Sequence, residues 1–139
     1  MAHPLDAKAH ELAPRLIGAA IEVHKHFGPG LIESVYEWAL IRELDLQGLS
    51  CQTQDYVQVR YKDAVRQHDL KFDVLVEGCL PVEVKAVDGV LPIHKAQLMT
   101  YLKLWDLPLG LLINFHEMRL ADGVTRLFVP GLRQRGDES

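Results

Sequence analysis

Two apolar segments near the middle of the chain are interrupted by charged residues, and this feature constrains the fold more than any other. The first segment, residues 70–76, contains Asp73, and the second, residues 82–86, contains Glu83 and Lys85. Successive side chains on a β-strand point to opposite faces of the sheet. The apolar residues expected on one face are Leu70, Phe72, Val74 and Val76 of the first segment and Val82, Val84 and Ala86 of the second. The pattern predicts two strands that carry two carboxylates and an amine on the other face.

Two carboxylates beside a cation suit one particular kind of chemistry. Carboxylates are seldom buried without a partner, and hard divalent ions such as Mg²⁺ or Mn²⁺ prefer oxygen ligands. We expect Asp73 and Glu83 to bind such an ion, with the backbone carbonyl of Val84 as a third oxygen ligand. Lys85 would orient the attacking water or stabilise the charge that develops on a phosphate. These residues predict cleavage of a phosphodiester bond, and a cross-strand ion pair between Lys85 and Asp73 is the structural alternative.

Two further motifs lie on either side of these strands. Residues 30–36 read G-x-x-E-x-x-Y, and residues 97–101 read Q-x-x-x-Y. Between them, nine residues separate Asp73 from Glu83, and one residue separates Glu83 from Lys85. The order and spacing of these motifs resemble the GxxExxY proteins, a group within the PD-(D/E)XK nuclease superfamily.

The resemblance extends over nearly the whole chain, from Leu16 to Pro130. Residues 110–115 look like the late apolar strand of that group, although His116 follows where the group usually has glycine. The resemblance implies an α/β fold of the restriction-endonuclease-like type, in which a mixed sheet is flanked by helices on both faces. It also implies a metal-dependent nuclease, a hydrolase that acts on DNA or RNA.

The motifs add five residues to the expected site, and four of them have a structural alternative. Glu33 is either a further metal ligand or an acid that stabilises the start of a helix. Tyr36 is expected to pack its ring and offer its hydroxyl to the site. Gln97 and Tyr101 would bind a metal-bound water or a phosphate oxygen, or else cap the edge of the sheet. His94 would transfer a proton or bind phosphate, or else form a hydrogen bond at the start of its helix.

Length and cysteine usage bound the class of protein. We expect one domain over residues 1–139, with a core from about residue 8 to residue 130 and a flexible tail at 131–139. Cys51 and Cys79 have no CxxC spacing, so we expect reduced thiols and a cytoplasmic location. The longest apolar run is too short to span a bilayer, so no membrane segment is expected.

The net charge of −4 argues against a large basic surface that coats nucleic acid. It favours an alternative function, in which a nuclease fold binds nucleic acid or a protein partner with negligible turnover. A homodimer is compatible with either function, because compact nucleases often act as dimers.

Hydrophobic periodicity gives the expected order of elements. Helices are expected over about 14–25, 32–46 and 92–105, and further strands over about 56–61, 109–115 and 124–129. The second helix is expected to bury Val35, Trp38 and Ala39. Three consecutive strands joined by short turns then predict an antiparallel meander.

Overall fold

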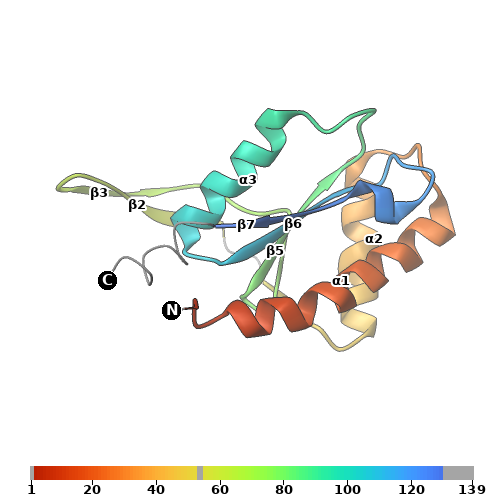
Figure 1. The fold of residues 1–139 in the computed structure, drawn as a ribbon, viewed down its shortest axis with the longest axis horizontal. Coiled ribbons are helices and arrows are strands. Elements are labelled where there is room, and N and C mark those ends of the chain that lie inside the picture. The colour runs from red at the N-terminus through yellow and green to blue at the C-terminus, as the bar shows by residue number, and fades with distance from the viewer. Residues whose placement is uncertain (1, 53–54, 130–139) are drawn as a thin grey trace.

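The protein has an α/β fold in which helices cover both faces of a mixed β-sheet, as seen in a computed structural model that describes residues 2–52 and 55–129 (Figure 1). The helices are α1 (Asp6–Phe27), α2 (Glu33–Leu46), α3 (Pro92–Trp105) and the short 3-10 helix η1 (Leu120–Gly123). The strands are β1 (Cys51–Gln52), β2 (Val57–Tyr61), β3 (Ala64–His68), β4 (Val74–Val76), β5 (Leu80–Lys85), β6 (Leu109–Asn114) and β7 (Val124–Phe128). The predicted fold class is confirmed, whereas the expected tail at 131–139 lies outside the described residues.

The main sheet has five strands in the order β1-β4-β5-β6-β7. Strands β4 and β5 are antiparallel, β5 and β6 are parallel, and β6 and β7 are antiparallel. A parallel pair needs a crossover between its strands, and α3 supplies it between β5 and β6. Within the described residues, no helix combines the length and apolarity that crossing a membrane requires.

Two apolar clusters cover the two faces of this sheet. Val82 and Val84 of β5 lie in the cluster that α1 and α2 close, together with Ile113 of β6. Leu112 of β6 lies in the other cluster, with Leu98 and other residues of α3. Because neighbours along a strand alternate, Glu83 and Lys85 belong to the face that α3 covers.

Helix α1 begins at Asp6, eight residues before the predicted start at Pro14, so the expected boundary is wrong. The buried side of the helix continues upstream of Pro14 through Ala9, Leu12 and Ala13. Pro14 is exposed and lies inside the helix. Proline removes one backbone hydrogen bond, but burial of the continuous apolar stripe outweighs that local cost.

Helix α2 has nearly the predicted bounds but buries a different face. The fully buried residues are Tyr36, Leu40 and Leu44, which recur at intervals of four, whereas Trp38 is 67% exposed. Val35 and Ala39 are only half-buried. The expected burial of Trp38 is therefore wrong, because the position of α1 beside α2 decides which side of the helix is covered.

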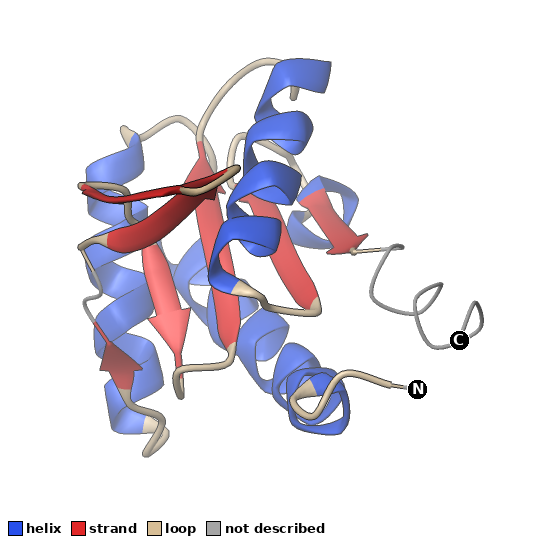
Figure 2. Cartoon of the chain, turned by 90° about the vertical axis from the view of Figure 1, so that its left-hand side faces the viewer, coloured by secondary structure: helices blue, strands red, loops and turns tan. Residues whose placement is uncertain are grey.

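The predicted three-strand meander is also wrong. Strands β2 and β3 form a separate antiparallel hairpin that projects from the body, and β4 and β5 pair within the main sheet (Figure 1, Figure 2). All five residues of β3 are exposed, so this strand has no apolar alternation that would predict it. The turns predicted at 62–63 and 77–78 are present, with positive φ at Lys62 and Glu77.

The C-terminal half follows the prediction closely. Helix α3 has the expected bounds, with Pro92 in its first turn, where a missing N–H costs no hydrogen bond. Strands β6 and β7 occupy the expected segments. All six residues of β6 are buried, which suits an interior strand of a sheet covered on both faces.

Candidate active site

The two predicted acids lie opposite each other at the start of β4. Val74 pairs with Val82, and extending this register by one residue places Asp73 opposite Glu83. The carboxylate of Asp73 accepts a hydrogen bond from the backbone N–H of Val84 at 2.8 Å. The carboxylate of Glu83 accepts one from the backbone N–H of Asp73 at 3.3 Å. The acids are therefore held together by each other's strands.

The chain bends at Asp73, and the bend changes the expected alternation. Val74 and Val76 lie in the cluster under α1 and α2, as an alternating strand requires. Phe72 was expected on the same face, but it packs in the cluster under α3. The expected face of Phe72 is therefore wrong, because regular strand geometry begins only at Val74.

The electrostatics of the acid pair are unfavourable when both carboxylates are charged. The pKa of Glu83 is raised to about 8, chiefly by burial and next by the charge of Asp73. The Asp73 N–H and the Lys85 ammonium only partly offset these effects. Near neutral pH the pair therefore favours a bound proton or a bound cation over two free charges.

Lys85 lies two residues after Glu83 on the same face of β5, at a half-buried position. Its backbone carbonyl accepts a hydrogen bond from Phe115 at 2.8 Å. The buried Asn114 pairs with Lys85 in the parallel register and bonds to both backbone groups of Val87. These contacts fix the end of β5. Among the described residues, no ion pair joins Lys85 to Asp73 or Glu83. The cross-strand ion pair between Lys85 and Asp73, considered as the alternative, is therefore not formed in this structure.

Helix α2 brings two more acids toward Asp73. Glu33 lies in its first turn, and Glu37 lies one turn later on the same side of the helix. Burial is the largest effect that raises the pKa of Glu37, and the charge of Asp73 is the second. The charge of Lys71 lowers this pKa, and the smaller effect of the Glu33 charge raises it. Glu37 was not among the residues predicted from the sequence, although its spacing of four from Glu33 was a usable signal.

Tyr36 faces the protein interior and organises the loop before α2. Its hydroxyl donates a hydrogen bond to the carbonyl of Gly28 at 2.5 Å and accepts one from the N–H of Leu31 at 3.1 Å. Its ring stacks on Phe115 at 4.5 Å between centroids. In contrast to the expectation, this hydroxyl serves the loop backbone, and through it the start of the helix that carries Glu33.

The residues of α3 have mixed surroundings. His94 accepts a hydrogen bond from the N–H of Leu91 at 3.0 Å, which is the helix-terminal alternative considered for it. Gln97 is exposed. Tyr101 packs its ring against Phe72 with centroids 6.1 Å apart, next to the bend at Asp73. In the part of the chain that the structure describes, no hydrogen bond joins Gln97 or Tyr101 to the strand acids, so their role stays a prediction.

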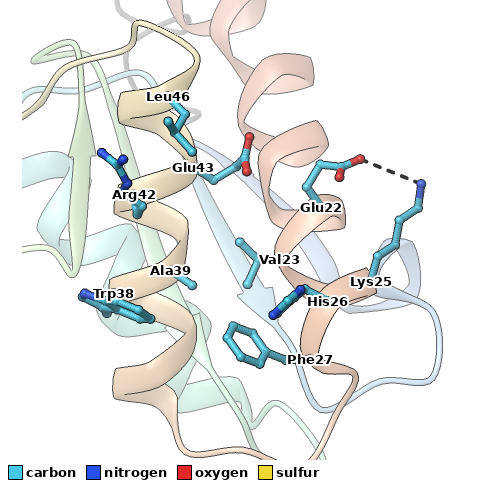
Figure 3. A pocket seen from close by; sticks show the side chains of 10 residues that line it. All are labelled: Glu22, Val23, Lys25, His26, Phe27, Trp38, Ala39, Arg42, Glu43 and Leu46. Carbon is cyan, nitrogen blue, oxygen red and sulfur yellow. Dashed lines mark ion pairs between the residues drawn. The ribbon is translucent and has the colours of Figure 1, made fainter.

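The site does not coincide with the groove between the outer sides of α1 and α2, which has a volume of about 570 Å³ (Figure 3). Its lining residues are Glu22, Val23, Lys25, His26, Phe27, Trp38, Ala39, Arg42, Glu43 and Leu46. None of the predicted site residues is among them. These lining residues come from two helices and include no acid pair beside a lysine on neighbouring strands, which is the arrangement that the predicted chemistry needs.

The acid pair fits a divalent ion that keeps part of its water shell. Among residues 2–52 and 55–129, no group of three or more His, Cys, Asp or Glu side chains is arranged to hold a metal ion. Mg²⁺, however, is commonly bound by one or two carboxylates, with waters and substrate phosphates as its other ligands. Asp73 and Glu83 match that donor set, and a cation would relieve the repulsion between them.

A mixed sheet covered on both faces, with two acids and a lysine on neighbouring strands, is the arrangement of a restriction-endonuclease-like nuclease core. A family model described as the PD-(D/E)XK nuclease superfamily matches residues 10–127. The chain belongs to this superfamily. No curated protein and no solved structure matches the chain significantly.

Proposed function

We propose that this protein is a metal-dependent nuclease of the GxxExxY group that hydrolyses phosphodiester bonds. The observation that supports this function best is the pair of opposed acids, Asp73 and Glu83, held at hydrogen-bonding distance from each other's strands and followed by Lys85 on the same face. Burial of Glu83 next to Asp73 favours a cation at this point.

Each residue has a separate task in this proposal. Asp73 and Glu83, with the carbonyl of Val84, would hold Mg²⁺ or Mn²⁺, which when bound polarises a phosphate oxygen and acidifies a water. The Lys85 ammonium orients the attacking water and stabilises the negative charge that develops on the phosphate. Glu33 extends the acidic surface from the start of α2, together with Glu37.

Side chains of α3 and α2 would complete the site. Gln97 and Tyr101 would bind a phosphate oxygen from the side of α3, where Tyr101 contacts Phe72, the residue before Asp73. Tyr36 positions Glu33 indirectly, because its hydroxyl bonds to both sides of the loop before α2. His94 would set the first turn of α3.

The alternative is a module that keeps the fold and the acids but has negligible turnover, and that binds nucleic acid or a protein partner. The net charge of −4 favours it. The two functions are separated by incubating the full chain with single- and double-stranded DNA and RNA in Mg²⁺, Mn²⁺ or EDTA. Cleavage that needs metal and is lost in Lys85→Ala supports the nuclease, whereas products equal to those in EDTA refute it.

We also propose a cytoplasmic location and a homodimeric assembly. Cys51 and Cys79 are free thiols, which suits the reducing cytoplasm. A homodimer is testable by sedimentation of the purified chain across a range of concentrations. A single monomeric species at micromolar concentration would contradict it.

A further inference from the structure

The β2–β3 hairpin packs little of its surface against the rest of the protein. It forms a two-stranded sheet of its own and extends away from the body (Figure 1, Figure 2). Val57 is buried at its base, next to α3, but every residue of β3 is exposed. An isolated two-stranded hairpin is at best marginally stable in water. A projecting arm of this kind therefore contributes little to the core, and its exposed side chains are free for recognition.

The strand register sorts these side chains onto two faces. On one face Gln58 lies opposite Gln67, and Arg60 lies opposite Val65. All four are exposed. Among the described residues, no side-chain hydrogen bond or ion pair engages Gln58, Arg60 or Gln67, whose backbones pair within the hairpin. This face thus presents two amides and a guanidinium that have no partner within the described part of the chain.

The charge of the hairpin is opposite to that of the whole protein. Residues 56–68 contain three cations, Arg60, Lys62 and Arg66, against one acid, Asp63, in a chain whose net charge is −4. Asp55 and Asp69 lie just outside this segment, so the local positive charge belongs to the two strands and their turn, where an anionic polymer could contact it.

The hairpin is also tied closely to the acid pair. Four residues separate His68, at the end of β3, from Asp73, so five Cα–Cα steps join them. Even fully extended, that connection spans only about 18 Å. This length is about half a turn of B-DNA, whose pitch is about 34 Å. A duplex gripped by the hairpin would therefore have its backbone within reach of the site.

We propose that the β2–β3 hairpin is a duplex-DNA recognition arm, which inserts its Gln58, Arg60 and Gln67 face into the major groove. This inference rests on the proposed nuclease function and names its substrate class. The major groove of B-DNA admits a two-stranded β-ribbon, and the side chains that read base edges there are chiefly arginine, for guanine, and glutamine or asparagine, for adenine. The major groove of A-form RNA is too deep and narrow for such side chains. The geometry favours DNA duplexes over RNA duplexes.

The test measures the binding of the full chain to a labelled 20-base-pair DNA duplex of mixed sequence by fluorescence anisotropy. The RNA duplex of the same sequence and the single DNA strand serve as competing substrates. EDTA is present, so no metal-dependent step contributes. We expect wild type to bind the DNA duplex at least roughly tenfold more tightly than the RNA duplex, because only the DNA groove admits the ribbon.

Two variants test the face itself. Arg60→Ala should weaken DNA-duplex binding by roughly tenfold and reduce the dependence on salt, as loss of an arginine contact does. Arg42→Ala is the matched control, since it removes an exposed arginine of α2 on another part of the surface and should change binding little. Gln58→Ala with Gln67→Ala changes no charge, so it should weaken DNA binding several-fold while leaving the salt dependence unaltered.

The outcomes separate this inference from the proposed function. Equal affinity for DNA and RNA duplexes, preference for the single strand, or wild-type DNA binding by both hairpin variants would overturn the recognition arm, even if the protein cleaves nucleic acid. Loss of DNA binding in the hairpin variants, together with a wild type that never cleaves, would support the arm and refute the nuclease. Thermal unfolding of each variant confirms that the exposed substitutions leave the fold intact.

Discussion

The carboxylates of Asp73 and Glu83 are held close together by hydrogen bonds to backbone N–H groups of the opposite strand segment. The Glu83 carboxylate accepts the N–H of Asp73 at 3.3 Å, and the Asp73 carboxylate accepts the N–H of Val84, the residue after Glu83, at 2.8 Å. These bonds keep two like charges close together, so the structure stores an unfavourable interaction where a cation would relieve it.

Binding of Mg²⁺ or Mn²⁺ should raise the melting temperature of the protein. A ligand that binds only the folded state adds about 2.7 kcal/mol at a hundredfold excess over its dissociation constant. Asp73→Asn and Glu83→Gln should each abolish this shift, yet leave the metal-free protein equally or more stable. Glu22→Gln, on the exposed side of α1, is the control and should retain the shift. A full shift in both site variants would place the metal elsewhere.

The stability of the metal-free protein should fall as the pH rises from about 5 to 8. Glu83 has an ordinary pKa of 4.5 and a folded-state pKa of about 8, so the folded chain binds more protons in this window. From this group alone, the free energy of unfolding should fall by at most about 1.4 kcal/mol per pH unit. Urea unfolding at several pH values measures the slope. Glu83→Gln should remove that component, and identical slopes in the two proteins would refute the assignment.

Lys85→Ala should separate binding from turnover. If the ammonium stabilises charge that develops in the transition state, its loss should lower cleavage by roughly two to three orders of magnitude while changing metal and nucleic-acid affinity only a few-fold. Lys85→Arg should not restore the rate, because a planar guanidinium does not replace a compact ammonium beside a water. Lys25→Ala, an exposed lysine of α1, is the control. Cleavage at the wild-type rate in Lys85→Ala would rule out this role.

Glu37→Gln should stabilise the metal-free protein and weaken its affinity for metal by roughly tenfold or less, as expected for a group that supports the ligands. Glu37 lies within the field of Asp73 and Glu33, so removing its charge lowers the repulsion and also the attraction for a cation. Titration calorimetry with Mn²⁺ measures the change. Glu43→Gln, further along the same helix, should leave metal affinity unaltered, and an equal loss in both variants would contradict a local effect.

Tyr36→Phe should lower the free energy of unfolding by about 1 to 2 kcal/mol, because the Gly28 carbonyl and the Leu31 N–H lose their shared partner. Tyr56→Phe removes a hydroxyl from a tyrosine that is 51% exposed, so it should have little effect. Guanidinium unfolding compares the two. If Tyr36→Phe is as stable as wild type but loses cleavage, the hydroxyl acts in the site and not in the loop.

Local patterns in the sequence predict part of the fold and site well. The bounds of α3 follow from Pro92 and the periodicity after it, and the buried β6 follows from a continuous apolar run. The shared face of Glu83 and Lys85 follows from strand alternation, which depends only on neighbouring residues. These features are encoded within a few positions of each other, so a single chain reveals them.

Features that depend on contacts between distant parts of the chain could not be predicted from local sequence patterns. The buried side of α2 was predicted at Trp38 but lies at Tyr36 and Leu40, because α1 determines which side is covered. The bend at Asp73 shifts Phe72 to the other core, and only the contact with α3 accounts for it. Glu37 comes within the field of Asp73 because α2 packs beside β5.

The sequence by itself determined the chemical groups, their order and the alternation that aligns them on strands. The tertiary structure decided which of these groups meet, since the pairing of β4 with β5 brings together Asp73 and Glu83, ten positions apart in the chain. It also decided that residues 57–68 leave the main sheet as a hairpin. The physical reason is that strand pairing and helix packing are chosen by the total apolar surface buried across the molecule, which no local pattern specifies.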